Sequence, residues 1–239
     1  MVGSVLTCLI FALAGFLFYT SARTSHGTDI RKDDTLLRLS DLIQQRSQQN
    51  AQTTDEIAAL RAQIDQLAAQ HVTNPADTAR LAALERAAGL EPLSGAGVTV
   101  TLNDAPPNAT AKIPGVPQPQ PDDLVIHQQD LQAVVNALWR GGATGIQVQD
   151  QRLISTSAVR CVGNQLILQG RVYSPPYVIK AVGDRASLIA SINADSYIQN
   201  YLQYVAAYGL GWKLTESKQL HLPGYTGTTD LQYAQASAR

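Results

Sequence analysis

Residues 36–71 read LLRLSDLIQQRSQQNAQTTDEIAALRAQIDQLAAQH. Apolar residues recur in this stretch at alternating spacings of three and four, which is the pattern of a coiled-coil seam. The seam has apolar ends and a polar middle. Its a and d positions are Leu36, Leu39, Ile43, Arg46, Asn50, Thr53, Ile57, Leu60, Ile64, Leu67 and His71.

The residue types in this seam favour pairing with a second copy of the chain. Isoleucine at a with leucine at d favours two parallel strands, and a lone Asn at an a position fixes their register. We therefore predict a parallel homodimer. The alternative is a single amphipathic helix packed on its own domain, although a helix of about 54 Å is longer than most domains can cover. The predicted dimerisation residues are Ile43, Asn50, Ile57, Leu60, Ile64 and Leu67.

Composition argues against several functional classes. The 239 residues leave room for one domain with an anchor and a stalk. The net charge of -1 gives no reason to expect a nucleic-acid partner. The two cysteines, Cys8 and Cys161, are too few for a disulfide framework or a cysteine-based metal site. We predict no cofactor and no bound metal.

The N-terminus lacks charged side chains from residue 2 to residue 22. As a helix this run would rise about 31 Å, enough to cross a hydrocarbon core of roughly 30 Å. It predicts a membrane span over residues 1–23. A signal peptide cleaved near residues 20–22 is the alternative. Basic residues follow the run, and the positive-inside rule taken alone would keep the rest of the chain in the cytoplasm.

The remaining chain divides by composition. Residues 24–72 form the predicted coiled-coil stalk, and residues 77–225 form a globular domain. Residues 104–123 hold six prolines, which predicts an exposed loop within that domain. The polar residues 226–239 are expected to form a flexible tail.

Within the globular part, alternating hydrophobicity and helix-capping residues define the elements. The order strand, helix, strands, helix, strand predicts an α+β fold, a ferredoxin-like split β-α-β sheet with an extra hairpin. The expected elements are a strand at 98–102, a helix at 129–140, a strand from 146, a hairpin at 158–172 turning at 163–164, a strand at 177–182, helices at 186–192 and from 195 to 209, and a strand at 212–216.

No catalytic site is apparent, because the histidines stand alone and no Cys or His pair has ligand spacing. The best polar constellation is Asn136, Arg152, Arg160, Lys180 and Asp184. If its cations converge, they predict an anionic ligand such as a phosphate or an envelope polymer. The structural interpretation is that Arg160 and Lys180 lie on exposed strand faces and Asp184 caps a helix. The tyrosines near residue 200 are expected to pack in the core and at its rim.

Several short motifs occur between residues 95 and 224. They are Gly95-Ala96-Gly97-Val98, Asp130-Leu131, Val135-Asn136-Ala137-Leu138-Trp139, Gly142-Ala143, Gln151-Arg152, Thr156-Ser157-Ala158-Val159-Arg160-Cys161, residues 175–184 (PPYVIKAVGD) and Leu222-Pro223. Together they resemble the YlxW-like family, domain of unknown function 881, of Gram-positive bacteria. One departure is the turn after the strand at 146, where the family often has Asn-Gly and this chain has Gln149-Asp150.

The resemblance implies a single-pass protein of the cell membrane with its C-terminal domain outside the cytoplasm. It also implies a family often found near cell-division and cell-wall genes, with no established enzymatic activity. We therefore predict a scaffold protein, not an enzyme, whose partners are other envelope or division proteins. The alternatives are an extracytoplasmic domain that binds an anionic envelope ligand, or an uncharacterised enzyme.

Overall fold

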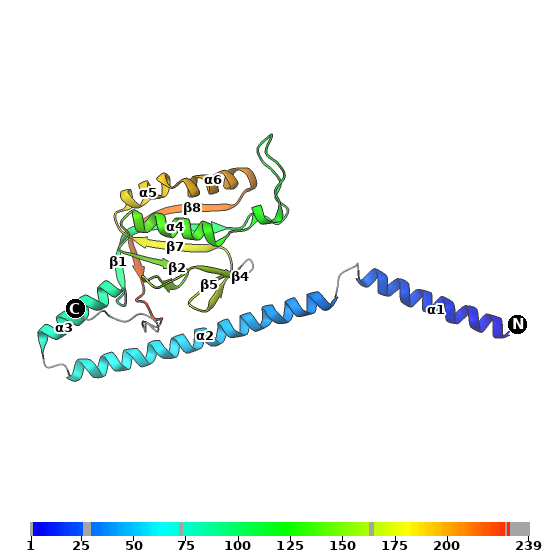
Figure 1. The fold of residues 1–239 in the computed structure, drawn as a ribbon, viewed down its shortest axis with the longest axis horizontal. Coiled ribbons are helices and arrows are strands. Elements are labelled where there is room, and N and C mark those ends of the chain that lie inside the picture. The colour runs from blue at the N-terminus through cyan, green and yellow to red at the C-terminus, as the bar shows by residue number, and fades with distance from the viewer. Residues whose placement is uncertain (1, 26–29, 72–73, 163–164, 228, 230–239) are drawn as a thin grey trace, which may run out of the picture. The chain divides into compact units, whose positions relative to one another are not determined.

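The structure is a computed structural model that describes residues 2–25, 30–71, 74–162, 165–227 and 229. The chain separates into two units at Arg46. The first unit holds α1 (Val2–Ser25) and the beginning of α2 (Ile30–His71). The second unit holds the rest of α2, α3 (Pro75–Ala88) and an α+β domain (Figure 1).

The predicted membrane span is wrong. A spanning helix needs about 20 consecutive, mostly apolar residues. Within the described ranges, no helix combines the required length with the required apolarity. The transmembrane helix expected over residues 1–23 is therefore not supported, and neither is the single-pass, extracytoplasmic placement that depended on it.

The α+β class is confirmed. A five-stranded sheet has the order β3-β2-β7-β1-β8, and all its neighbouring strands are antiparallel. Three helices connect its strands: α4 leads from β1 to β2, and α5 and α6 lead from β7 to β8. The strands are β1 (Leu93–Asn103), β2 (Gly145–Val148), β3 (Gln151–Arg152), β7 (Tyr177–Val182) and β8 (Gly211–Leu222), and the helices are α4 (Gln128–Arg140), α5 (Arg185–Ala194) and α6 (Ser196–Tyr208).

The core lies between this sheet and the three helices. Directly paired strand residues point to the same face, so Val100, Ile179 and Val148 form one apolar row across the sheet. All three are fully buried, as are Leu131 and Leu138 on the inner side of α4. In Figure 1 the three helices lie together on one side of the sheet.

A second sheet replaces part of the predicted hairpin. It joins β4 (Arg160–Val162), β5 (Gln165–Leu168) and β6 (Arg171–Tyr173). The single strand expected from Gln165 to Val172 is wrong, because the chain reverses at Gln169 and Gly170. Both residues have positive φ, 49° and 77°, as a tight hairpin turn requires. The turn expected at residues 163–164 lies outside the described residues.

Two segments border the domain. In the proline-rich loop, η1 (Pro121–Leu124) forms a single 3₁₀ turn before α4. Helix α3 is capped by the Asn74 side chain, which accepts from the Ala76 N–H. Most of the tail predicted at 226–239 lies outside the described residues.

The motif Gly95-Ala96-Gly97 permits an unusually close strand contact. The pairing of β1 with β8 shifts register between Gly95 and Gly97, which is a bulge. A Cβ added to Gly97 would lie 1.9 Å from the Ala181 carbonyl oxygen of β7. No side chain can be accommodated there without separating β1 from β7.

Replacing Gly97→Ala should therefore lower the free energy of unfolding by about 2 kcal/mol or more, as overpacking against backbone does. Urea denaturation measures the change. The exposed neighbour is the control, and Ala96→Ser should stay within about 0.5 kcal/mol of wild type. Equal stability of Gly97→Ala and wild type would contradict the close contact.

Candidate functional site

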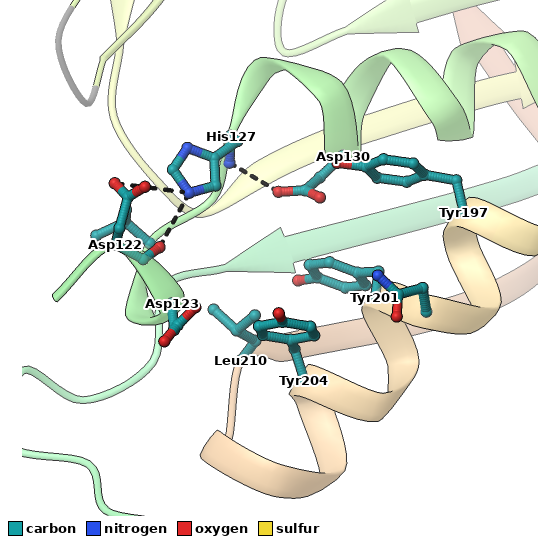
Figure 2. Close-up of a pocket in the computed structure, with 10 residues that line it drawn as sticks. Asp122, Asp123, His127, Asp130, Tyr197, Tyr201, Tyr204 and Leu210 are labelled. Carbon is teal, nitrogen blue, oxygen red and sulfur yellow. Dashed lines mark hydrogen bonds and ion pairs between the residues drawn. The ribbon is translucent and has the colours of Figure 1, made fainter. Parts of the chain in front are cut away.

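A cavity of about 220 Å³ opens between η1, the start of α4 and α6. We call it the tyrosine–aspartate pocket, and Figure 2 shows its lining side chains. One wall is acidic and the opposite wall is aromatic. The lining residues are Asp122, Asp123, Val125, His127, Asp130, Tyr197, Asn200, Tyr201, Tyr204 and Leu210.

The aromatic wall comes from one side of α6. Tyr197, Tyr201 and Tyr204 are spaced by four and three residues, so they project from the same helix face. The Tyr201 hydroxyl donates to the Gly211 carbonyl at 2.9 Å, and its ring lies 5.9 Å from that of Trp212. These contacts fix the buried tyrosine at the base of the wall.

The acidic wall is organised by the beginning of α4. The Asp130 carboxylate accepts from the His127 N–H at 2.7 Å, which satisfies one of the free N–H groups of the helix start. The His127 Nε2 lies 2.9 Å from the Asp122 carbonyl oxygen. Asp130 is only 8% exposed and faces Tyr197, whereas the Asp122 side chain is largely exposed (Figure 2).

Burial shapes the protonation of this pocket. Desolvation raises the pKa of Asp130, and the hydrogen bond from His127 only partly opposes it. Desolvation, followed by the nearby charge of Asp130, also raises the pKa of Tyr197 and Tyr201. The tyrosine hydroxyls therefore stay neutral near pH 7, and a negative charge on Asp130 is held at a cost in a poorly solvated place.

This pocket was not predicted from the sequence, because the residues of its two walls are more than sixty positions apart. Tyr201 and Tyr208 were expected to pack in the core, and both are buried. Tyr197 and Tyr204 instead line the cavity. The available signal was a tyrosine spacing typical of one helix face, together with three aspartates in the nine residues 122–130.

The predicted polar constellation lies on several elements. Arg152 and Lys180 both pair directly with Gln147, so they point to the same outer face of the sheet. Arg160 lies on the second sheet. The other two members are separate: Asn136 is exposed on α4, and the Asp184 carboxylate caps α5 by accepting from the Ser187 N–H.

Arg152 has a structural environment. It is 5% exposed, and its Nη1 donates to the Pro223 carbonyl at 3.2 Å. A Cβ on Gly145 would lie 2.5 Å from its Nη2, so the guanidinium occupies the space beside that glycine. Its Nε and the neighbouring Gln147 Oε1 are buried without a hydrogen-bond partner among the described groups. Anion binding by the constellation stays a prediction, but this guanidinium is already held by the C-terminal segment.

The predicted seam residues separate into two environments. The Asn50 Nδ2 donates to the Gly170 carbonyl at 3.1 Å, in the turn between β5 and β6. The apolar seam residues that follow on α2 are exposed. Exposed fractions are 39% for Ile57, 58% for Leu60, 62% for Ile64 and 57% for Leu67. Ile43 lies in the first unit and is partly exposed.

The raised pKa of Asp130 predicts how acid affects stability. Above pH 3.8, the ordinary pKa of an aspartate, the Asp130 carboxyl keeps its proton in the folded state but loses it in the unfolded state. The free energy of unfolding therefore falls as the pH rises from about 3.8. Asp130→Asn keeps an oxygen acceptor for His127 and removes the titration. The variant should lose less unfolding free energy than wild type between about pH 3.8 and neutrality, as urea denaturation across that range measures.

The change in net charge is controlled by Asp122→Asn on the same wall, whose side chain is 87% exposed. Parallel pH profiles for Asp130→Asn and wild type would show that burial of this carboxylate has no such effect.

Comparison with known proteins places the chain in a family. A family model described as "Bacterial protein of unknown function (DUF881)" matches residues 80–235. A crystal structure of an uncharacterized conserved protein from Mycobacterium tuberculosis is 26% identical, with a TM-score of 0.49, and the match covers 66% of this chain and 99% of that one.

Two curated relatives show the extent of the similarity. The UPF0749 protein Rv1823 of Mycobacterium tuberculosis is 30% identical over 159 residues, covering 66% of this chain and 51% of the relative. The UPF0749 protein YlxW of Bacillus subtilis is 30% identical over 102 residues, covering 42% and 41%. The chain thus spans about half the length of the first of these relatives. The predicted resemblance is confirmed, and the chain belongs to the DUF881 family of bacterial proteins of unknown function.

Proposed function

We propose that this chain is an interaction protein that pairs with a second copy of itself through α2 and presents its α+β domain to other proteins. The observation that carries the proposal is the exposed apolar stripe formed by Ile57, Leu60, Ile64 and Leu67. These residues follow the a and d positions of a heptad pattern, which matches a second copy of the same helix. Four large apolar side chains at such spacing form a continuous surface that gains free energy on leaving water.

The side of α2 that contacts its own domain is a different one. The Ser47 Oγ accepts from the Val172 N–H at 2.8 Å, and Asp55 pairs with Arg171 at 2.9 Å. At 100° per residue, the apolar stripe lies roughly 80–160° around the helix from Ser47. Pairing through the stripe therefore leaves these domain contacts intact, so the two interpretations of this stretch are compatible.

Asn50 contacts the domain although its a position places it only about 20–40° around the helix from Ile57 and Ile64. Its amide is bonded to Gly170, so it has a local partner before any second copy arrives. The proposed pairing therefore depends on the apolar residues 57–67, and the register-setting role of Asn50 stays a prediction.

A role in cell division or envelope assembly also stays a prediction. It came from the family resemblance, and the names of the relatives state no activity. The proposal concerns the contact that the residues can make, namely a paired helix that carries two domains.

The stripe can be tested on the full chain by analytical ultracentrifugation. Leu60→Glu with Ile64→Glu should convert a dimer to a monomer, because each pair of helices would bury four carboxylates in an apolar seam. Dissociation at about ten micromolar protein would require a loss of several kcal/mol, well within the cost of such burial.

The matched control adds the same charge to the same turns of α2. Ala59→Glu with Gln66→Glu changes two exposed residues away from the stripe and should leave the dimer in place. A wild-type chain that sediments as a monomer at high micromolar concentration would refute the proposal, as would equal dissociation of both double variants.

A further inference from the structure

We propose that the tyrosine–aspartate pocket binds an alkylammonium group, the charged end of an organic amine. This inference does not depend on pairing through α2, and it assigns to the domain a ligand of defined chemistry. The inference rests on the cavity, the charge of its walls and the aromatic side chains that face those charges.

The charge of the walls selects a cation. Asp122, Asp123 and Asp130 supply three carboxylates, and none of the ten lining residues is Lys or Arg. Asp123 is held by the Gln120 N–H at 2.8 Å and Asp130 by His127, so both carboxylates are oriented before a ligand arrives. An anion would meet repulsion from all three.

The aromatic wall selects an organic cation over a metal ion. Ca²⁺ and Mg²⁺ require a shell of oxygen ligands, whereas one wall of this cavity is formed by the side chains of Tyr197, Tyr201 and Tyr204. A ring face attracts an ammonium or its adjoining methylene groups within about 6 Å of its centroid. Among the described residues, no group of three or more His, Cys, Asp or Glu side chains could hold a metal ion.

The size of the cavity favours an end group over a whole large ligand. Its 220 Å³ lies below the range of roughly 300–1,000 Å³ typical of sites for drug-sized molecules. It exceeds the space of several water molecules, each of which occupies about 30 Å³ in the liquid. An ammonium with a short alkyl chain matches this volume, and its carbon chain would lie against Tyr204 and Leu210.

Two sources share this chemistry, a free amine and the lysine side chain of a protein. Asp122, with its largely exposed side chain, marks the open edge of the pocket. A chain entering past Asp122 could end inside the cavity and continue outside it. The experiment therefore tests a free amine and a lysine side chain side by side.

The experiment titrates the full chain with n-butylammonium and with N-acetyl-lysine methylamide by isothermal titration calorimetry. Amide chemical shifts of residues 122–130 and 197–210 locate the binding. We expect n-butylammonium to bind and neutral 1-butanol not to bind. Binding of the lysine compound as well, lost on Nε-acetylation, assigns a protein lysine as a source; binding of n-butylammonium alone assigns a free amine.

The variants separate the site from general charge effects. Asp123→Asn should weaken binding about tenfold, a change of 1.4 kcal/mol in affinity. Adding Tyr204→Leu should remove detectable binding, while circular dichroism and thermal unfolding verify that the domain is folded. Matched controls are Asp41→Asn and Tyr19→Leu, both exposed and outside the domain, and neither should change the affinity.

Three results would overturn the proposal. The first is no binding of either ammonium compound up to about 10 mM, the range of the weakest specific ligands. The second is binding of 1-butanol or the acetylated lysine compound as tightly as the charged probes. The third is an equal loss of affinity in the Asp41→Asn control and the Asp123→Asn variant.

Discussion

The close approach of β1 to β7 is the contact on which the domain depends. β1 is hydrogen-bonded on both sides, to β7 and to β8, so it joins the first half of the domain to the second. At Gly97 the two backbones come closer than any side chain allows. This contact fixes the register that places Val98 and Val100 on the face covered by the helices. Without that register, the apolar rows of the sheet would not meet α4, α5 and α6.

The tyrosine–aspartate pocket is a consequence of the same arrangement. α4 and α6 lie on one face of the sheet because the chain crosses over that face twice, once after β1 and once after β7. Leu131 and Ile198 anchor the two helices in the common core. The beginning of α4 therefore faces α6, with the acids on η1 and the first turn of α4 and the tyrosines on α6. The opposite face of the sheet carries Arg152 and Lys180 instead.

Much of the fold could be predicted because its signals are local. The strand at 177–182, the cap at Asp184 and the helix that begins near residue 195 are where the pattern predicted them. The turn at Gln169 was missed because glutamine rarely takes positive φ, and Gly170 beside it was the one turn signal within the apolar run. The absence of charge at the N-terminus was a poor guide, since the described helices include none able to span a bilayer.

The candidate site could not be predicted because it depends on contacts between distant segments. Asp130 was noticed only as part of a family motif, and its burial follows from the packing of α4 against α6. Arg152 was noticed as a candidate ligand-binding cation, but the Pro223 carbonyl, seventy-one residues later, accepts its hydrogen bond. Residue type identified the chemistry in both cases. Only the tertiary fold decides whether a charge is open to a ligand or already bonded.

The polar contact between α2 and its own domain has a consequence for valency. Ser47 and Asp55 hold the domain to one side of the helix, and the apolar stripe lies on another. In a parallel pair formed through the stripe, both domains would lie on the outer sides at the same height along the helices. Such a pair would carry two copies of the tyrosine–aspartate pocket in one assembly. A partner with two suitable groups would bind the second at a high effective concentration, so weak single contacts could add up to strong avidity.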